Sequence, residues 1–335
     1  MAHRATLIDV IGATAHFTSQ LVKALKSGLA CDVVLLTVNP SEIKANRLVP
    51  RFTYKIITLA LLVKNYIVLF SRAINCSKDQ LFIFNIPLVP SIEVFFVWLV
   101  AQRSGVSVGI LHNEEPSHGE RNLIRNYRYI EFYNRCDIVV FHDPSISEKF
   151  HQMFPDALPV LSNVPSYSVP DFSNYDRKKT SKVGAIKIAL LGTIRRYKNL
   201  EIIFPEFEML GHQQRKSLSL RVAGKSFYDV KRLIEDLESL CLGEFSFTDD
   251  FLEDEQFYKE MMDCDFLLVP HSSSSGSALL SVASALGVPI IGSDLPVVRE
   301  VIARNRSGVV FDHLSRGDLC RVVSRLLNDP RSVQV

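Results

Sequence analysis

The stretch that decides the fold is residues 264–293, "CDFLLVPHSSSSGSALLSVASALGVPIIGS". The apolar run 264–270 predicts a buried strand, and "VPIIGS" (288–293) predicts a second one. Between them lies a segment of small residues that fits a closely packed helix. Strands that are apolar throughout, rather than alternating, are typical of parallel sheets covered by helices on both faces. The stretch therefore predicts a strand–helix–strand unit of an α/β fold.

The serines between the first strand and the helix suggest a binding role. A flexible linker would explain the serines, but it would not explain the strands on either side. Ser275 and Ser277 can accept hydrogen bonds from the free N–H groups of the helix start, and Gly276 leaves room for a ligand. Such an end carries partial positive charge and binds phosphates. The alternative is a serine-rich turn that only caps a core helix.

The same alternation of strands and helices runs through the whole chain. The expected strands are 6–12, 31–38, 80–87, 106–113 and 136–143, followed by 185–193, 217–224, 243–250, 264–270, 288–293 and 308–312. Residues 165–184 are rich in Pro, Ser and charge and lack periodicity, so they are expected to be a linker. The sequence thus predicts two doubly wound Rossmann-like domains, residues 1–164 and 185–335, facing a cleft. Ligands bind such sheets at the carboxyl ends of the strands.

Composition narrows the class of function. The chain has 335 residues, is 47% hydrophobic and carries a net charge of +2, so no strong basic field points to a nucleic-acid partner. Its six cysteines form no CxxC pair, which favours reduced thiols. The first residues lack the pattern of a signal peptide. We therefore expect a cytoplasmic protein.

One segment complicates this expectation. Residues 52–71, "FTYKIITLALLVKNYIVLFS", are long enough to cross a bilayer. Lysines interrupt the run, and a lysine at the membrane centre costs about 2.5–3.5 kcal/mol, which disfavours a spanning helix. Two alternatives stay open. One is a buried core helix, and the other is a helix on a membrane surface that turns Arg51, Lys55, Lys64 and Arg72 toward the headgroups.

A basic turn follows the strand 185–193. The segment "GTIRRYKN" (192–199) places Gly192 at the turn and Arg195, Arg196 and Lys198 just before a helix. Cations at the carboxyl end of a strand suit a phosphate. The alternative is an ordinary basic turn without a ligand.

In their order along the chain, these motifs resemble those of glycosyltransferases with the GT-B fold, especially family 4. The matching segments of the second half are Gly192 with Lys198, "VAG" (222–224), "FTDDFLEDEQFYKEMMDCDFLLVP" (247–270), Ser275 with Gly276, Gly287 with Pro289, and "SDLPVVREVI…SGVVFD" (293–312), which contains Glu300. Those of the first half are "VGILHNEEP" (108–116), "CDIVVFHDPSISEKF" (136–150) and "PVLSNVP" (159–165).

The resemblance implies transfer of a sugar from a UDP- or GDP-linked donor, with no cofactor. Arg195, Arg196, Lys198 and the serine-capped helix would hold the diphosphate, and Glu300 matches a glutamate of the family's donor side. No metal is expected, because "DCD" (263–265) precedes its strand and lies away from the ligand end.

An acceptor hydroxyl needs a base if the reaction inverts the sugar. The candidates are His112, Glu114 and Glu115, which follow the strand 106–113. Thr14 and His16, after the first strand, are expected on the acceptor side. The alternatives are a satisfied core histidine and a solvated acidic loop.

The chain also departs from the family. Two glutamates usual in family 4 are replaced by Ser274 and Val282, and the chain ends at "LLNDPRSVQV", before a further helix that is usual there. We expect a transferase that builds a surface glycan, on a glycan or lipid-linked acceptor, at the cytoplasmic membrane face. The alternatives are a catalytically inactive partner of another glycosyltransferase and a nucleotide-sugar epimerase, which the scarcity of acids near residues 271–290 disfavours.

Overall fold

A computed structural model of the chain gives the fold. It describes residues 4–9, 15–28, 32–37, 51–78, 80–112, 126–142, 146–162, 169, 172, 175, 185–273 and 278–329. The chain divides into two compact units, Met1–Pro165 (unit 1) and Ser166–Val335 (unit 2). Each unit is built on its own parallel sheet, which confirms the expectation of two Rossmann-like domains.

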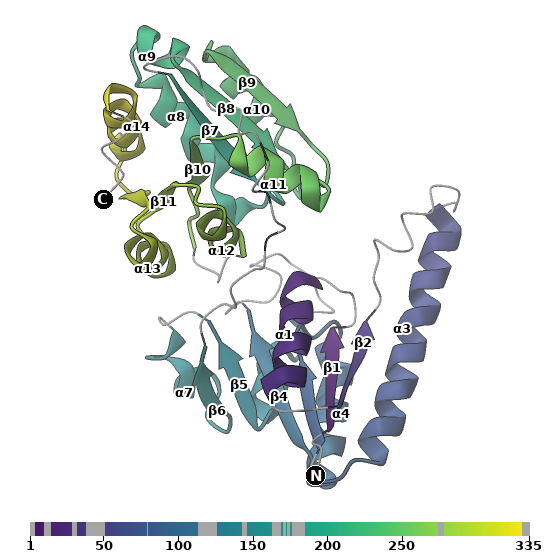
Figure 1. The fold of residues 1–335 in the computed structure, drawn as a ribbon. Helices are drawn as coiled ribbons and strands as arrows, with labels where there is room; N and C mark the ends of the chain where they lie inside the picture. Colours follow the sequence, from purple (N-terminus) through teal and green to yellow (C-terminus); the bar gives the residue numbers. More distant parts are fainter. Residues whose placement is uncertain are drawn as a thin grey trace. The chain divides into compact units, whose positions relative to one another are not determined.

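Unit 1 is built on a six-stranded sheet of order β2-β1-β3-β4-β5-β6. Its strands are β1 (Arg4–Asp9), β2 (Asp32–Thr37), β3 (Gln80–Phe84), β4 (Val106–Leu111), β5 (Ile138–Phe141) and β6 (Leu158–Leu161). Its helices are α1 (Ala15–Gly28), α3 (Arg51–Ile74), α4 (Pro90–Gln102), α6 (Tyr129–Arg135) and α7 (Phe150–Met153). Alternate residues of a strand point to opposite faces, and both faces are covered here. Leu25 of α1 packs with Ile83, whereas Phe82 and Phe84 pack with α4 and α6. Figure 1 labels most of these helices and strands.

Unit 2 is built on a six-stranded sheet of order β12-β11-β10-β7-β8-β9. Its strands are β7 (Ile186–Leu191), β8 (Leu218–Ala223), β9 (Glu244–Thr248), β10 (Phe266–Val269), β11 (Ile290–Ser293) and β12 (Gly308–Phe311). Its helices are η3 (Arg196–Lys198), η4 (Leu200–Ile202), α8 (Ile203–Glu208), α9 (His212–Lys216), α10 (Lys231–Ser239), α11 (Asp254–Met262), α12 (Ala278–Ala285), α13 (Pro296–Asn305) and α14 (Asp318–Asn328). Helices α8, α10 and α14 cover one face, and α11, α12 and α13 cover the other.

The predicted strands are all present, but most end earlier than expected. The strand expected at 185–193 ends at Leu191 because Gly192 turns the chain with φ +84°. Within the predicted linker 165–184, Val169, Phe172 and Tyr175 pack against the core of unit 2. These three positions therefore belong to the second unit.

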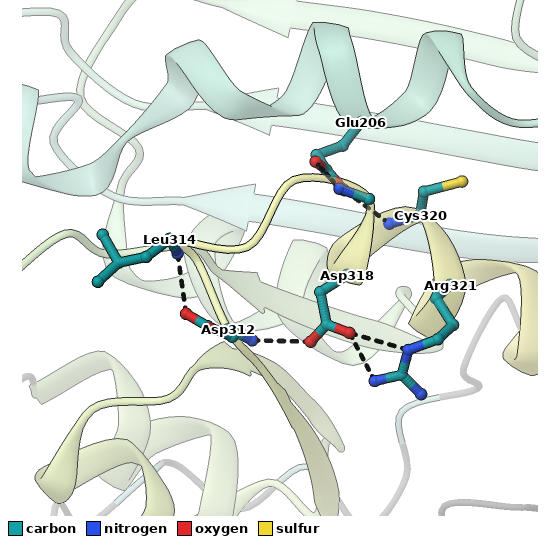
Figure 2. Close-up of polar contacts among 7 residues, drawn as sticks. Glu206, Asp312, Leu314, Asp318, Cys320 and Arg321 are labelled. Atoms are coloured by element: carbon teal, nitrogen blue, oxygen red, sulfur yellow. Dashed lines mark hydrogen bonds and ion pairs between the residues drawn. The ribbon is translucent and has the colours of Figure 1, made fainter.

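The last helix of unit 2 is fixed to the first part of the unit by a buried carboxylate. Glu206 on α8 accepts hydrogen bonds from the backbone N–H groups of Gly317 (2.6 Å) and Cys320 (2.9 Å) (Figure 2). Asp318 accepts from the Asp312 N–H (2.9 Å) and from Arg321. Two N–H groups at the start of α14, those of Gly317 and Cys320, are thus satisfied by a side chain, and negative charge lies where the helix dipole favours it.

Helix α3 is only partly buried, which disfavours the first of the two alternatives, a buried core helix. Leu69 and Ala73 are buried against the core of unit 1. The opposite side exposes Leu59 (61%) and Ile67 (63%). Within the described residues, Ile57–Ile74 is the one helix long and apolar enough to cross a membrane by length and composition.

Candidate functional site

The sheet of unit 2 reverses its winding between β7 and β10. Starting from β7, the chain adds β8 and β9 on one side and then β10, β11 and β12 on the other. The segment after β7 leads to α8 on one face, and the segment after β10 leads to α12 on the opposite face. Ligands of open α/β sheets bind at such a switch point, outside the carboxyl ends of the strands. The basic turn and the serine stretch follow these two strands.

Two glycines bring the ends of β7 and β8 close together. The Gly192 N–H donates to the Ala223 carbonyl at 2.9 Å. A Cβ atom on Gly224, whose φ is +154°, would lie 2.1 Å from the Gly192 carbonyl oxygen. Real Cβ atoms do not approach backbone so closely, so any side chain at Gly224 would push the two strand ends apart. The glycines therefore shape the backbone that supports the basic turn.

Lys198 is the central cation of this turn. Its side chain is buried, and its Nζ donates to the Leu191 carbonyl at 2.6 Å. Burial, and secondarily the neighbouring Arg195 cation, lower the pKa of Lys198 to about 7. An anion bound beside the ammonium would favour its charged form. Lys198 is thus a partly neutral amine near pH 7 that an incoming phosphate would recharge.

The two arginines of the same turn lie on aromatic rings. The guanidinium carbon of Arg195 is 4.0 Å from the centroid of the Phe227 ring, and that of Arg196 is 5.0 Å from the Tyr228 ring. A cation over an aromatic face is attracted by the ring quadrupole. A backbone hydrogen bond joins the loop after β7 to the loop after β8, since the Phe227 N–H donates to the Ile194 carbonyl at 2.9 Å. Three cations are therefore held at the carboxyl end of β7.

The basic turn also contacts the start of the serine stretch. Ser272 follows β10, and its N–H donates to the Tyr197 carbonyl at 2.8 Å. The buried His271 meets the Tyr197 ring edge-on, with centroids 5.2 Å apart. The turn after β7 and the end of β10 thus form one surface. The predicted phosphate-binding residues Ser275, Gly276 and Ser277 lie outside the described residues.

Glu300 lies on a different element from the basic turn. It is in α13, where its exposed carboxylate forms an ion pair with Arg304 one turn later. A role in donor binding stays a prediction.

A second polar cluster lies at the switch point of unit 1, between β1 and β3. Buried Asp9 ends β1, and its Oδ2 accepts from the Thr18 hydroxyl at 2.5 Å. Asn85 follows β3, and its Nδ2 donates to the Thr18 Oγ1 at 3.0 Å. The Asn85 Oδ1 lies 2.7 Å from Nε2 of His112, which follows β4. The structure therefore joins one predicted catalytic residue to three polar groups from neighbouring strand ends and α1.

A second histidine accompanies His112. The ring centroids of His112 and His142 are 5.8 Å apart, and Nδ1 of His142 donates to the Ser162 carbonyl at 2.8 Å. Burial lowers the pKa of His142, so this ring favours its neutral form.

The other predicted residues of unit 1 cannot be placed. Glu114, Glu115 and Thr14, as well as the side chain of His16, lie outside the described residues.

Sequence reasoning missed Asp9, Thr18, Asn85 and His271. Three of them stand at or just after the end of an apolar run, in "TLID", "LFIFN" and "FLLVPH". A polar residue there is the signal that could have found them, because the ends of parallel strands gather at one edge of the sheet.

No metal centre is apparent in the part of the chain that the structure describes, since no three His, Cys, Asp or Glu side chains gather there. In the "DCD" segment, Asp265 accepts from the Lys187 N–H at 2.8 Å, and Asp263 accepts from the Tyr175 hydroxyl at 3.1 Å. Both aspartates are thus engaged at the start of β10.

Comparison with protein families decides the class of unit 2. Residues 171–334, nearly all of this unit, match the family described as glycosyl transferases group 1. Unit 2 is a group 1 glycosyltransferase domain. The match to residues 171–334 supports the glycosyltransferase activity that the sequence predicted. No curated protein matches the chain.

Solved glycosyltransferase structures share the fold of the whole chain. The sucrose-phosphate synthase of Thermosynechococcus elongatus is 15% identical, with a TM-score of 0.68 over 99% of this chain and 91% of the other. Anabaena Alr3699/HepE in complex with UDP-glucose is also 15% identical, with a TM-score of 0.67 over 99% and 92%. The α,α-trehalose-phosphate synthase of Burkholderia xenovorans is 10% identical, with a TM-score of 0.64 over 99% and 93%. These likenesses confirm the GT-B fold.

Proposed function

We propose that this glycosyltransferase moves a sugar from a nucleotide-sugar donor to a glycan or lipid-linked acceptor. The observation that carries the proposal is the cationic switch point of unit 2. Lys198 is buried there at the end of β7, where it senses the charge of Arg195, and Arg196 starts the same short helix, η3. A buried amine poised near neutral pH, in a turn of backbone N–H groups and arginines, suits a diphosphate.

The reaction breaks the bond between the anomeric carbon and the diphosphate oxygen, while the acceptor oxygen bonds to that carbon. Negative charge grows on the leaving diphosphate, and fixed cations stabilise it most where water is excluded. Lys198, Arg195 and Arg196 are the groups proposed for this role. The acceptor proton needs a base in an inverting reaction, and His112, Glu114 and Glu115 are the candidates.

The nature of the donor is supported by similar structures. HepE has been solved with UDP and with UDP-glucose, and an Escherichia coli protein of the same fold with UDP-2-fluoro glucose. We therefore favour a UDP-linked donor over a GDP-linked one.

Thermal unfolding with a panel of UDP, GDP, ADP, CMP and their sugars tests the donor site. A ligand at 100 times its dissociation constant stabilises the folded state by about 2.7 kcal/mol. We expect a UDP-containing ligand to raise the midpoint in the native protein but not in Lys198→Ala. The matched control is Lys231→Ala, because Lys231 is 82% exposed on α10. A flat response of well-folded native protein would contradict the proposal.

We also propose that unit 1 docks on a membrane surface. Leu59, Val63, Ile67 and Phe70 form an exposed apolar stripe on α3. The stripe continues onto α4, because Phe70 stacks with Phe95 (6.5 Å between centroids) and Phe95 with Trp98 (5.9 Å). We call these six residues the apolar face.

Charge favours an anionic lipid surface over a second copy of the chain. Helix α3 contains four basic residues and no acidic one, so two copies meeting through this helix would bring like charges together. Aromatic residues such as Trp98 are enriched at membrane interfaces. A lipid-linked acceptor would be reached from there, at the cytoplasmic side, for synthesis of a surface polysaccharide.

Sedimentation with vesicles of phosphatidylcholine and phosphatidylglycerol tests the apolar face. We expect the native protein to sediment with them and Leu59→Gln/Ile67→Gln to stay in solution. Leu314→Gln is the matched control, because Leu314 is an 85% exposed apolar residue of unit 2. Sedimentation of the double variant at the native level would contradict docking. Concentration-dependent dimerisation lost in the double variant would instead identify a second copy as the partner.

One observation favours a second candidate function, that of a catalytically inactive partner of another glycosyltransferase. Val282 stands where the family resemblance places the glutamate that binds the ribose, and its side chain on α12 is buried in the core. The chain therefore offers no carboxylate at this position to bind a ribose. Sugar transfer by the purified protein alone would exclude this alternative.

A further inference from the structure

We propose that Asp9, Thr18 and Asn85 form a positioning relay that holds the His112 ring in one orientation, with a proton on Nε2. This inference rests on the proposed function, in which His112 is a candidate base. The three residues, which we call the relay, do not touch the reacting atoms in this proposal. They act through His112 alone.

The direction of the hydrogen bonds follows from the donors available. A carboxylate can only accept, and a threonine hydroxyl has a single hydrogen. The 2.5 Å bond to Asp9 therefore uses the Thr18 hydrogen. The Thr18 oxygen is left as an acceptor, and the Asn85 amide nitrogen donates to it at 3.0 Å. The carboxylate thus sets the orientation of an amide two bonds away.

That orientation fixes the histidine. With its nitrogen directed to Thr18, the Asn85 amide presents its oxygen to His112, 2.7 Å from Nε2. An oxygen acceptor at this distance requires a hydrogen on Nε2. In the neutral ring the lone pair then lies on Nδ1, so the relay selects one of the two tautomers.

The surroundings keep the relay in one arrangement. Asp9, Thr18 and Asn85 are 1%, 3% and 0% exposed, so water does not compete for their bonds. The Asn85 backbone N–H also donates to the Ile8 carbonyl at 2.9 Å, which fixes Asn85 between β1 and β3. The relay therefore crosses the switch point of unit 1 and ends at the carboxyl end of β4.

A second feature sets Asp9 apart from an ordinary structural anchor. Within the described part of the chain, its Oδ1 is buried and has no hydrogen-bond partner. Leaving a buried polar atom unsatisfied costs about 1–3 kcal/mol, and more for a charged group. A neutral residue could anchor Thr18 at lower cost. An ionised carboxylate, unlike such a residue, has no hydrogen to donate, so Thr18 must be the donor of this pair.

The test uses Thr18→Val, which keeps the shape of the side chain and removes the hydroxyl. In the full-length protein with ¹⁵N-labelled histidine, the native enzyme should show a ring N–H signal of His112 that is protected from exchange with water. Thr18→Val should lose this signal. Its kcat should fall about 10- to 100-fold, the effect of a small misplacement of a reacting group. The KM for the donor should be unchanged, and Thr18→Ser should restore both the signal and kcat.

A double-mutant cycle separates the relay from a general structural effect. In the His112→Ala background, Thr18→Val should have no further effect on kcat. A loss of the same size in that background, or an unchanged ring signal in Thr18→Val, would overturn the proposal. If Thr18→Val does not fold, Asn85→Ala replaces it, because this variant keeps the backbone bond to Ile8.

The ring signal also distinguishes the relay from the proposed function. If the protein transfers no sugar but the native ring signal is present and lost in Thr18→Val, the relay holds and the proposed function fails. If transfer occurs and the ring signal does not depend on Thr18, the relay fails alone.

Discussion

The two units place opposite chemistry at equivalent points of two similar sheets. In unit 1 the winding reverses between β1 and β3, where a buried carboxylate, a hydroxyl and an amide lead to a histidine. In unit 2 the winding reverses between β7 and β10. There, two arginines lie on aromatic rings, and a lysine donates to a backbone carbonyl. The fold fixes where a ligand can bind, and a few residues at the strand ends decide which ligand.

The largest effect is expected where backbone geometry alone supports the cationic site. Gly224→Ala places a Cβ 2.1 Å from the Gly192 oxygen and should lower the free energy of unfolding by about 3 kcal/mol or more. Gly287→Ala is the control, because its φ is also positive (+63°) but its Cβ meets nothing within 4 Å. It should cost about 1–2 kcal/mol. Urea unfolding followed by circular dichroism measures both, and equal losses would refute the close approach of β7 and β8.

The next effect concerns charge. Because the pKa of Lys198 is lowered to about 7, the side chain is cationic below this pH and neutral above it. Donor affinity should therefore weaken as the pH rises from 7 to 9, by up to about tenfold per unit if only the cation binds. Isothermal titration calorimetry with UDP-glucose measures this affinity at each pH. The charge of the diphosphate does not change in this range. A flat profile of the native protein would show that Lys198 does not hold the donor. The control is Lys198→Arg, whose affinity should not depend on pH because arginine stays charged in this range.

A smaller effect is expected from the aromatic support of the cations. Phe227→Ala removes the ring 4.0 Å from the Arg195 guanidinium and should weaken donor binding by roughly 0.5–1 kcal/mol. Phe227→Tyr keeps a ring at this position and should bind the donor as the native protein does. Equal affinities of the alanine and tyrosine variants, measured by the same titration, would mean that the ring does not position Arg195 for binding.

The smallest effect tests how far the cationic site extends. Glu300 pairs with Arg304 on an exposed face of α13, and such surface pairs contribute about 0.3–0.5 kcal/mol. Glu300→Gln should therefore hardly change the unfolding midpoint. Arg304→Gln removes the same pair and is the control. A loss of donor affinity in Glu300→Gln alone would add α13 to the site, and equal affinities would remove Glu300 from it.

Much of this comparison was predictable from the sequence. Buried parallel strands are apolar throughout, so both sheets could be predicted from runs such as "DVVLLT" and "IKIALL". The basic turn was identified because its cations are adjacent in sequence. The burial of Lys198 was not predicted, because it depends on how the ends of β7 and β8 approach each other.

The relay could not be predicted for a related reason. Asp9, Thr18, Asn85 and His112 meet only because β1, β3 and β4 are adjacent in the sheet, and strand order is not written in any local pattern. The exposure of one side of α3 could likewise not be predicted from the sequence. A helix that is apolar on most sides has the same composition whether its neighbours cover one face or all of them.

The Glu206 carboxylate has a consequence for how the chain matures. It leaves the ribosome more than a hundred residues before Gly317 and Cys320, which supply its hydrogen bonds. Throughout this interval α8 carries a carboxylate whose partners have not been made, so unit 2 cannot complete its packing during translation. Among the described residues of unit 1, the hydrogen bonds have both partners within that unit. Unit 1 can therefore fold first. Unit 1 would then be formed before unit 2 is complete.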